Sequence, residues 1–284
     1  MMRGMFAAIS GLKQHQVMLD VTANDISNVN TIGYKSARVT FQDSLTQLQR
    51  GAAGATTNTG GSNAAQVGLG VGLGSIDNLM TGGTRQTTGN PLDVAIEGDG
   101  FFQIGEGNPT TANSPITPTA YTRAGNFSVS NGGFLTTQTG KYVTGYQMDQ
   151  ATGNPITTQV AIKIPDGATG VAIDNSGGVS WVDATSGTRV TGYRLTLATF
   201  SNAAGLERSG GNSWVTSANS GQKTVNTPGI GGAGSTSPGS VEMSNVDLSQ
   251  TFTNMITAQR GFQANSRVIS TADEMLQDLV NLKR

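Results

Sequence analysis

The sequence contains no cysteine, one histidine and few charged side chains, which make up 12% of its 284 residues. The lack of cysteine excludes disulfide bonds, thiolate metal ligands and cysteine nucleophiles. A single histidine, His15, cannot form a histidine-rich metal site, and we expect it to be solvated or to lie in an interface. The net charge of −1 provides no basic surface for nucleic acid or for an anionic membrane.

Long apolar runs are also missing. No run of about 18 apolar residues occurs, so we predict no transmembrane helix and no membrane insertion. Near the N-terminus, Lys13, His15 and Asp20 interrupt the apolar residues before the core of a secretory signal peptide could form. We therefore expect no cleaved signal peptide of this kind.

Glycine is abundant instead, with 40 residues, and only 36% of the chain is hydrophobic. Serine, threonine and asparagine are also frequent, and this mixture favours turns and exposed strands. A chain of this length makes one or two domains with real cores.

Residues 3–30 predict a helix with one narrow apolar stripe. The apolar residues follow alternating steps of four and three, interrupted by Gln16, and this spacing is typical of a coiled coil. A second stripe of small residues, Gly4, Ala8 and Gly11, lies one position before the first and allows a neighbouring backbone to approach closely. The apolar stripe consists of Met5, Ile9, Leu12, Leu19, Ala23 and Ile26.

Residues 245–284 predict a second helix with a matching stripe. Ser244, followed three residues on by Asp247, indicates a capping box at its start. A neighbouring row is apolar only at its ends, at Phe252 and Val280. The main row falls seven residues apart without a break, at Leu248, Met255, Phe262, Ile269 and Leu276.

The two stripes predict one helical module built from both ends of the chain, and self-assembly through it. The alternative is an intramolecular bundle of the two helices. We favour assembly because two helices pack only one stripe each, whereas the small-residue stripe and the partly polar row indicate further neighbours. The predicted assembly residues are the members of both stripes together with Phe252 and Val280.

The middle of the chain predicts β structure. "LDVAIEGDGFFQI" (92–104) alternates around an Asp99-Gly100 turn, and Asn131-Gly132 lies between two short alternating runs, which indicates a hairpin. Residues 36–49 could be strand or short helix, residues 50–66 predict a long loop or flexible arm, and residues 219–240 predict a linker. Further strands are predicted at residues 160–164, 178–182 and 193–200, and Trp181 and Trp214 are expected to pack inside the β domain.

Motifs that carry chemistry are weak or absent. "GLGVGLG" (68–74) lacks the Gly-Lys-Ser/Thr and the helix that follow in a phosphate-binding loop, so we interpret it as a glycine-bearing strand. No carboxylate pair is indicated by spacing. We predict no catalytic, cofactor-binding or metal-binding residues.

The predicted fold class is mixed α and β, with a discontinuous terminal α-helical coiled-coil module and an inserted all-β domain of sandwich or barrel type. The expected divisions are residues 1–30 and 245–284 for the helical core, 31–80 for an extended linker or arm, and 81–240 for the β-rich domain.

Four segments resemble the bacterial flagellar rod and hook family. In "LDVTANDISNVNTIGYKSARVTFQD" (19–43), a helix runs into an asparagine-rich turn and a Gly-aromatic-Lys, here Gly33, Tyr34 and Lys35, with Asp25 where the family usually has a second adjacent asparagine. The other segments are "TGNPLDVAIEGDGFF" (88–102), "YTRAGNFSVSNGGFL" (121–135) and the C-terminal block 244–284.

This resemblance implies a structural subunit and no enzyme. "RVTFQD" (38–43), "EMSNVDLS" (242–249) and the closing "VNLKR" are most similar to short hook members, which implies a hook subunit that forms a helical tube and transmits torque from rod to filament. The alternative within the family is a distal rod subunit, and outside it a secreted β-rich adhesin or a carbohydrate enzyme.

The resemblance also implies the location and the partners. The chain would work in the hook and basal body after export by the flagellar type III apparatus. Its partners would be identical subunits, the distal rod protein, a hook cap protein and the hook–filament junction proteins, with no nucleic acid and no cofactor.

Overall fold

The computed structural model describes residues 2–57, 60–107, 109, 115–149, 154–184 and 186–282. It divides into two compact units, each formed from segments distant in sequence. The helical unit comprises Met1–Ser27, Ala37–Asp77 and Asp247–Arg284, and the β unit comprises Asn28–Ser36 and Asn78–Val246.

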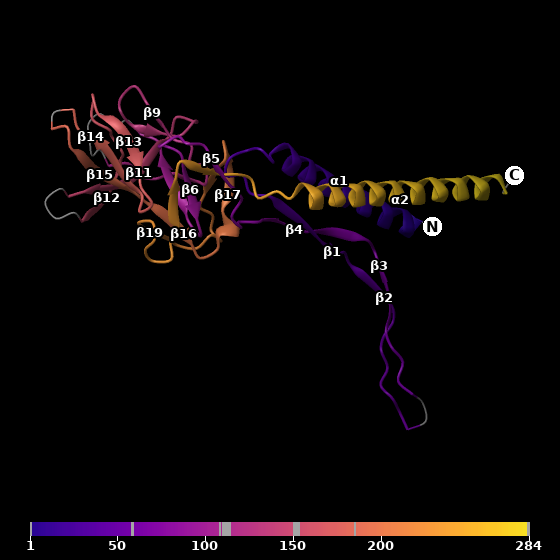
Figure 1. The fold of residues 1–284 in the computed structure, drawn as a ribbon. Helices are drawn as coiled ribbons and strands as arrows, with labels where there is room; N and C mark the ends of the chain where they lie inside the picture. Colours follow the sequence, from indigo (N-terminus) through magenta and orange to yellow (C-terminus); the bar gives the residue numbers. More distant parts are fainter. Residues whose placement is uncertain are drawn as a thin grey trace. The chain divides into compact units, whose positions relative to one another are not determined.

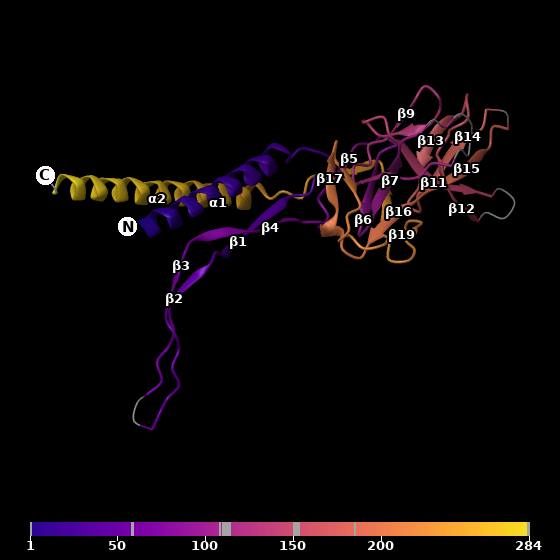
Figure 2. The same ribbon diagram turned by 180° about the vertical axis from the view of Figure 1, so that it is seen from behind.

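The helical unit pairs the two terminal helices, α1 (Met2–Ser27) and α2 (Leu248–Asn281), which lie side by side (Figures 1 and 2). Strand β1 (Ala37–Asp43) pairs with β4 (Val71–Asn78), and β2 (Thr46–Arg50) pairs antiparallel with β3 (Ala65–Gly68). No helix in the described part of the chain has the length and hydropathy needed to span a membrane.

Local interactions set where the helices begin and end. The carboxylate of Asp247 accepts hydrogen bonds from the backbone N–H groups of Ser249 (2.8 Å) and Gln250 (3.2 Å), which fixes the start of α2. The capping residue is therefore Asp247 and not the predicted Ser244, and α2 begins three residues later than expected. At the end of α1, the buried carboxylate of Asp25 accepts from the N–H of Ala37 at 3.2 Å and so closes the turn between helix and strand.

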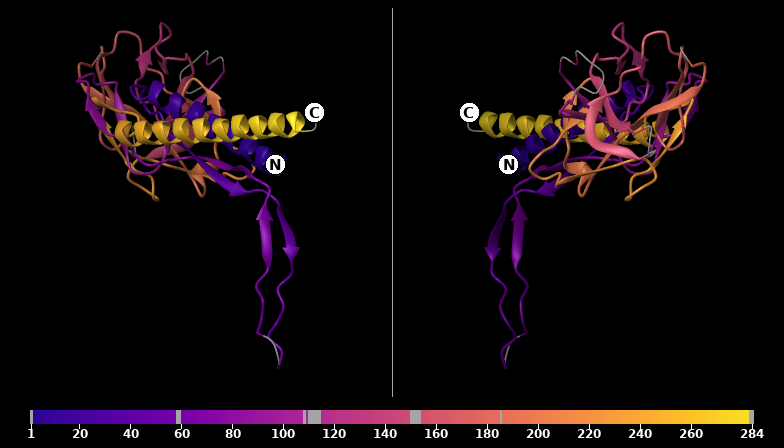
Figure 3. Two further views of the ribbon diagram at one scale, coloured as in Figure 1. Left: turned by 90° about the vertical axis from the view of Figure 1, so that its right-hand side faces the viewer. Right: turned by 90° about the vertical axis from the view of Figure 1, so that its left-hand side faces the viewer.

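The β unit is built around one large curled sheet (Figure 3). Within the described residues thirteen strands join it, and its main path runs β13-β14-β15-β11-β7-β8-β18-β17, with β16, β19, β12, β10 and β9 attached. The strands of this sheet are β7 (Phe101–Gly105), β8 (Ala120–Thr122), β9 (Ser128–Val129), β10 (Leu135–Thr136), β11 (Tyr142–Met148), β12 (Pro155–Ala161), β13 (Thr169–Ile173), β14 (Gly178–Val182), β15 (Arg189–Leu195), β16 (Leu197–Phe200), β17 (Glu207–Gly210), β18 (Ser213–Val215) and β19 (Lys223–Asn226).

Two smaller sheets and a short helix complete the β unit. Antiparallel pairs form between β6 (Val94–Glu97) and β20 (Ser235–Pro238) and between β5 (Arg85–Thr87) and β21 (Ser240–Glu242). A single 3₁₀ turn, η1 (Ala203–Gly205), precedes β17. The predicted linker at 219–240 is therefore wrong, because this segment contributes β19, β20 and the first residue of β21 through main-chain pairing.

Apolar side chains fill the β unit. The main cluster includes Phe102, Leu135, Val143 and Leu195, all fully buried, and it also holds Trp181. A second cluster packs Trp214 among neighbours that include Phe101 and Tyr121. The expected packing roles of both tryptophans are confirmed.

Several predicted elements are present. Asn131-Gly132 forms the turn of the β9–β10 hairpin, residues 178–182 are β14, and the "GLGVGLG" segment belongs to β3 and β4. The region 36–49, for which the sequence predicts either strand or short helix, contains strand β1 and most of β2. The predicted fold class, terminal helices with an inserted β domain, is confirmed.

Candidate assembly surfaces and the buried junction

Small residues make the contact between α1 and α2. On α1, Ala8, Gly11 and Thr22 are buried, and on α2 Ala258 and Ala272 are buried with them. The buried residues of α2 also recur at heptad spacing, and their small side chains allow the two backbones to approach closely. Two members of the small-residue stripe noted in the sequence, Ala8 and Gly11, are therefore buried inside one chain, whereas the third, Gly4, is exposed.

Two close approaches define this contact. A Cβ atom at Gly261 of α2 would lie 2.5 Å from the imidazole of His15 on α1, and one at Gly11 would lie 2.8 Å from the Asn265 side chain. His15 also meets Phe41 of β1 edge-to-face, with ring centroids 5.9 Å apart. His15 thus fills a space between three elements of the helical unit.

We predict that Gly261→Ala lowers the melting temperature of the helical signal in far-ultraviolet circular dichroism. The added methyl group must displace His15, and overpacking of this kind costs about 1–3 kcal/mol. The matched control is Gly4→Ala on α1, where nothing lies within 4 Å of the new Cβ. Because alanine is the better helix former, this control should gain up to about 1 kcal/mol. Equal melting temperatures for both variants would contradict the close contact.

The predicted apolar stripes flank this contact. The half-buried members are Met5, Leu12, Leu19, Ile26, Met255, Phe262, Ile269 and Leu276, and the exposed members are Ile9, Ala23, Leu248, Phe252 and Val280. A single chain therefore leaves much of the predicted assembly surface uncovered.

Additional large apolar side chains are exposed on both helices. Met2 and Phe6 of α1 are about 60% exposed, and Ile256, Met275 and Leu279 of α2 are about half exposed. A different row of α2 is polar, with Thr253, Arg260, Arg267 and Glu274 seven residues apart and all exposed. Exposed apolar residues gathered beside a polar row mark a surface that another protein covers.

A charged junction lies buried in the β unit. The Lys35 ammonium donates to the Glu242 carboxylate at 2.6 Å and to the Thr81 carbonyl at 2.7 Å, and Arg123 donates to the other carboxylate oxygen at 3.3 Å. The three charged side chains are at most 3% exposed. Burial lowers the pKa of Lys35 below its usual value; nearby Arg123 lowers it further, while the Glu242 carboxylate opposes the shift. One carboxylate thus holds two buried cations.

The junction ties four chain segments together. Gly83 donates its N–H to Glu242 at 2.9 Å, and the Asn245 side chain accepts from the N–H of Ser36 and donates to the carbonyl of Leu79. Gly33 adopts a left-handed φ of +67°, and a Cβ there would lie 2.7 Å from the Arg123–Ala124 backbone. The segment after α1 and the segment before α2 are therefore anchored in one place.

Tyr34 extends the junction to the sheet. Its ring lies under the guanidinium of Arg208, 4.8 Å from ring centroid to the central carbon, and Arg208 also lies over Trp214. Arg208 donates to the Tyr34 hydroxyl at 3.2 Å and to the Lys35 carbonyl. Sequence reasoning identified Gly33, Tyr34 and Lys35 as a motif but missed their partners, because the partners lie far away in the sequence.

No group of potential metal ligands occurs in the part of the chain that the structure describes. The exposed apolar surface of the two helices and the buried junction around Glu242 are features that suit a protein that assembles.

Comparison with known proteins agrees with this description. Three family models match: "Flagella basal body rod protein" at residues 5–35, "Flagellar hook protein FlgE/F/G D1 domain" at 95–181, and "Flagellar basal body rod FlgEFG protein C-terminal" at 237–282. The flagellar basal-body rod protein FlgG of Bacillus subtilis is 45% identical over 285 residues and covers 100% of both chains. The chain belongs to the flagellar rod and hook protein family.

Other relatives in the flagellar rod and hook family show the same pattern. The FlgG protein of Caulobacter vibrioides is 37% identical over 287 residues, with 99% of this chain and 100% of the relative covered. The flagellar hook protein FlgE of Borreliella burgdorferi is 26% identical over an alignment of 441 residues that covers both chains fully. Rod proteins are therefore more similar to this chain than the hook protein is, and they favour the rod alternative over the hook prediction.

Membership in this family indicates the general kind of function. Flagellar rod and hook proteins are structural components of the flagellum and not an enzyme family, and their subunits self-assemble into homopolymers within the basal body. The predicted family is confirmed.

Proposed function

We propose that the chain is the distal rod subunit of the flagellar basal body. The observation that carries this proposal is the end-to-end match to rod proteins of nearly equal length, at 45% identity for the Bacillus subtilis relative. The hook relatives align over 441 and 472 residues, although this chain has 284, so long insertions separate them from it.

In this proposal the terminal helices of many copies pack against one another through the exposed and half-buried apolar residues of α1 and α2. The surface left uncovered in one chain supports this assignment, because burying each large apolar side chain contributes about 1.5–3 kcal/mol. Identical subunits are the principal partners, and the type III export apparatus would deliver them. A hook cap and hook–filament junction proteins belong to the hook alternative and are not part of the proposal.

Labelling of isolated basal bodies separates the rod from the hook. We expect immunogold particles against an epitope tag inserted at residue 229, an exposed glycine in a turn of the β unit, to mark the straight axle. The untagged chain provides the background. Gold on the curved segment would overturn the distal rod assignment in favour of the hook, and gold on neither structure would overturn both.

A further inference from the structure

One asparagine in the sequence is followed directly by glycine, at Asn131-Gly132 in the turn between β9 and β10. The N–H of Gly133 donates to the Ser130 carbonyl at 2.8 Å and closes this turn, and Gly133 then adopts a left-handed φ of +78°. A short hairpin loop commonly ends in a left-handed glycine of this kind. Asn131 and Gly132 are both exposed at the tip of the hairpin.

The fold leaves the Asn131 side chain and the Gly132 main-chain nitrogen free. The N–H of Gly132 donates to no group in the part of the chain that the structure describes, and the Asn131 amide makes no hydrogen bond there. Glycine also has no side chain to shield its own main-chain nitrogen. The nitrogen of residue 132 and the side-chain carbonyl carbon of residue 131 are therefore open to reaction with each other.

The asparagines that precede serine, another small residue, are held by hydrogen bonds. The N–H of the residue after Asn175 donates to the Asp174 carboxylate at 2.8 Å, and the N–H of the residue after Asn219 donates to the Ser217 carbonyl at 3.3 Å. The N–H of the residue after Asn265 lies inside α2, where it belongs to the hydrogen-bond ladder of the helix. A main-chain nitrogen that is bonded in this way resists the loss of its proton.

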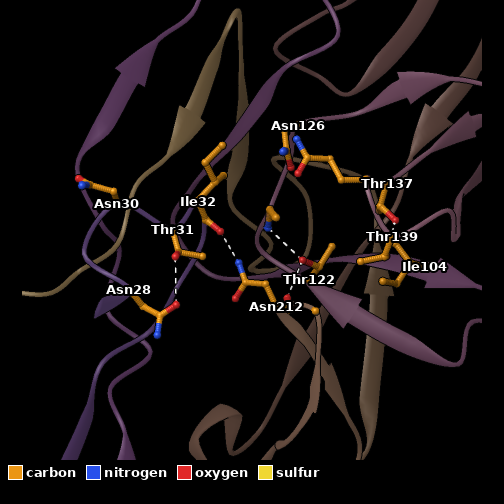
Figure 4. Close-up of a pocket in the computed structure, with 13 residues that line it drawn as sticks. Asn28, Asn30, Thr31, Ile32, Ile104, Thr122, Asn126, Thr137, Thr139 and Asn212 are labelled. Atoms are coloured by element: carbon orange, nitrogen blue, oxygen red, sulfur yellow. Dashed lines mark hydrogen bonds between the residues drawn. The ribbon is translucent and has the colours of Figure 1, made fainter. Parts of the chain in front are cut away.

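Asn212, which also precedes serine, is held through its own groups. Its side-chain amide donates to the Ile32 carbonyl, and its main-chain carbonyl accepts from the Thr122 hydroxyl at 2.9 Å (Figure 4). Both bonds oppose the rotation that would bring its side chain onto the following nitrogen. Asn131 has no such restraint and is therefore the exception among these asparagines.

We propose that Asn131 is a site of spontaneous deamidation. The Gly132 nitrogen loses its proton to hydroxide and attacks the side-chain carbonyl carbon of Asn131. A bond forms between that nitrogen and that carbon, the bond from the carbon to the amide nitrogen breaks, and the amide takes a proton from water and leaves as ammonia. Water then opens the five-membered imide at either of its carbonyl groups, which gives aspartate or isoaspartate. The whole change consumes water, releases ammonia and needs no oxidant.

Isoaspartate at this position alters the hairpin, because the main chain then runs through an extra carbon. The turn has little room for it: a Cβ at Gly133 would lie 2.5 Å from the Ile164 carbonyl, and the Gly133 carbonyl accepts from the Ile164 N–H at 2.8 Å. The Asp166 carboxylate lies 3.8 Å from the same Cβ position, so either product adds a second negative charge beside it. The site does not depend on whether the chain builds rod or hook.

Peptide mapping by mass spectrometry tests the proposal on the purified full-length chain, incubated at alkaline pH in water enriched in heavy oxygen. Oxygen taken up from water marks each asparagine that has reacted, and isoaspartate shows that the imide was formed. We expect label at Asn131 to appear at least about tenfold faster than at Asn175, Asn212, Asn219 or Asn265, because its free, unshielded nitrogen lowers the barrier. Equal rates at these positions, or label at Asn131 without isoaspartate, would overturn the proposal.

Guanidinium chloride separates the effect of the fold from that of the sequence. Unfolding frees the main-chain nitrogens that follow Asn175, Asn219 and Asn265, so label there should appear about tenfold faster, whereas the rate at Asn131 should change by less than about threefold. A large increase at Asn131 on unfolding would show that the native turn protects it, which contradicts the proposal.

Two variants test which nitrogen attacks. Gly132→Ala adds a methyl group that shields the nitrogen and would lie 3.3 Å from the Phe134 ring, and the rate at Asn131 should fall roughly tenfold. Asn131→Gln keeps an exposed amide but requires a less favourable six-membered imide, so residue 131 should stay unlabelled while the rates at the other asparagines remain the same. An unchanged rate in Gly132→Ala, or rapid labelling in Asn131→Gln, would show that the Gly132 nitrogen does not attack residue 131.

Discussion

Replacing Glu242 with glutamine is expected to lower the free energy of unfolding of the β unit by about 3 kcal/mol or more. The change keeps the shape of the side chain but removes the negative charge that pairs with Lys35 and Arg123. Both cations would then remain buried without a counter-charge, at exposed fractions of 0% and 3%. Loss of one partner in a buried ion pair is costly because water cannot solvate the charge that is left.

Urea unfolding followed by tryptophan fluorescence measures this effect, since Trp181 and Trp214 both lie in cores of the β unit. The control is Glu97→Gln, which removes the carboxylate of an exposed pair with Arg85. An exposed pair contributes at most about 1 kcal/mol, so the control should shift the midpoint little. Similar midpoints for the two variants would show that the buried cluster does not anchor the unit.

A double variant separates charge from packing. Lys35→Met in the Glu242→Gln background removes one of the two uncompensated cations, so part of the lost stability should return. Lys35→Met alone should be destabilising, because it removes the closer of the two cations that contact Glu242 and leaves Arg123 at 3.3 Å. The coupling between the two changes is expected to be on the order of 1–3 kcal/mol. Additive effects would mean that Lys35 and Glu242 are not energetically coupled, which would contradict the ion pair.

The helices could be predicted from sequence because their signal is local. Heptad spacing over residues 248–276 and over 5–26 identifies a helix whatever lies around it. Which stripe faces which neighbour is not a local property. The large apolar residues looked like the helix–helix contact, but within one chain the small stripe with Gly11 and Gly261 forms it. The close approach of the two backbones places small residues at the contact, and the large residues are left half-buried or exposed.

The failed linker prediction at 219–240 has a similar cause. Strand β20 has the sequence Ser-Thr-Ser-Pro and β21 has Ser-Val-Glu, so no alternating hydrophobic pattern marks either strand. Their main-chain groups pair with β6 and β5, which lie more than a hundred residues earlier. Glu242 lies just after the predicted linker. Nothing in the neighbouring sequence indicates that it pairs with Lys35, which is 207 residues away.

The choice between rod and hook was misdirected by short matches. The segment "EMSNVDLS" (242–249) lies in a part that rod and hook members share, since the family model matched at 237–282 describes FlgE, FlgF and FlgG together. The distinguishing property is global: the chain aligns with the Bacillus subtilis rod protein over 285 positions, while the alignments with the hook relatives extend over 441 and 472 positions. Length and overall identity carry that information, and motifs do not.

Changing Phe252 to aspartate is expected to abolish assembly while leaving the single chain folded. Phe252 is 49% exposed and lies on α2 beside the exposed Ile256 and Leu248. In one chain the new carboxylate remains in water, so the free energy of unfolding should change by less than about 0.5 kcal/mol. In the assembly it would lie against apolar surface without a partner, at a cost of several kcal/mol in every copy.

The matched control for this change is Thr253→Asp, which places the same charge one residue further on, in the exposed polar row that contains Arg260 and Arg267. Electron microscopy of basal bodies from cells that express each variant in place of the host subunit gives the readout, and urea unfolding of each purified chain reports on its fold. The control should build rods and support swimming, whereas the Phe252 variant should stop growth of the axle before this subunit. The assignment of the apolar face to assembly depends on that contrast, because each substitution adds a single carboxylate to the same turn of α2. Rods of normal length from the Phe252 variant would show that this face stays exposed to solvent in the flagellum and that the copies pack through another surface.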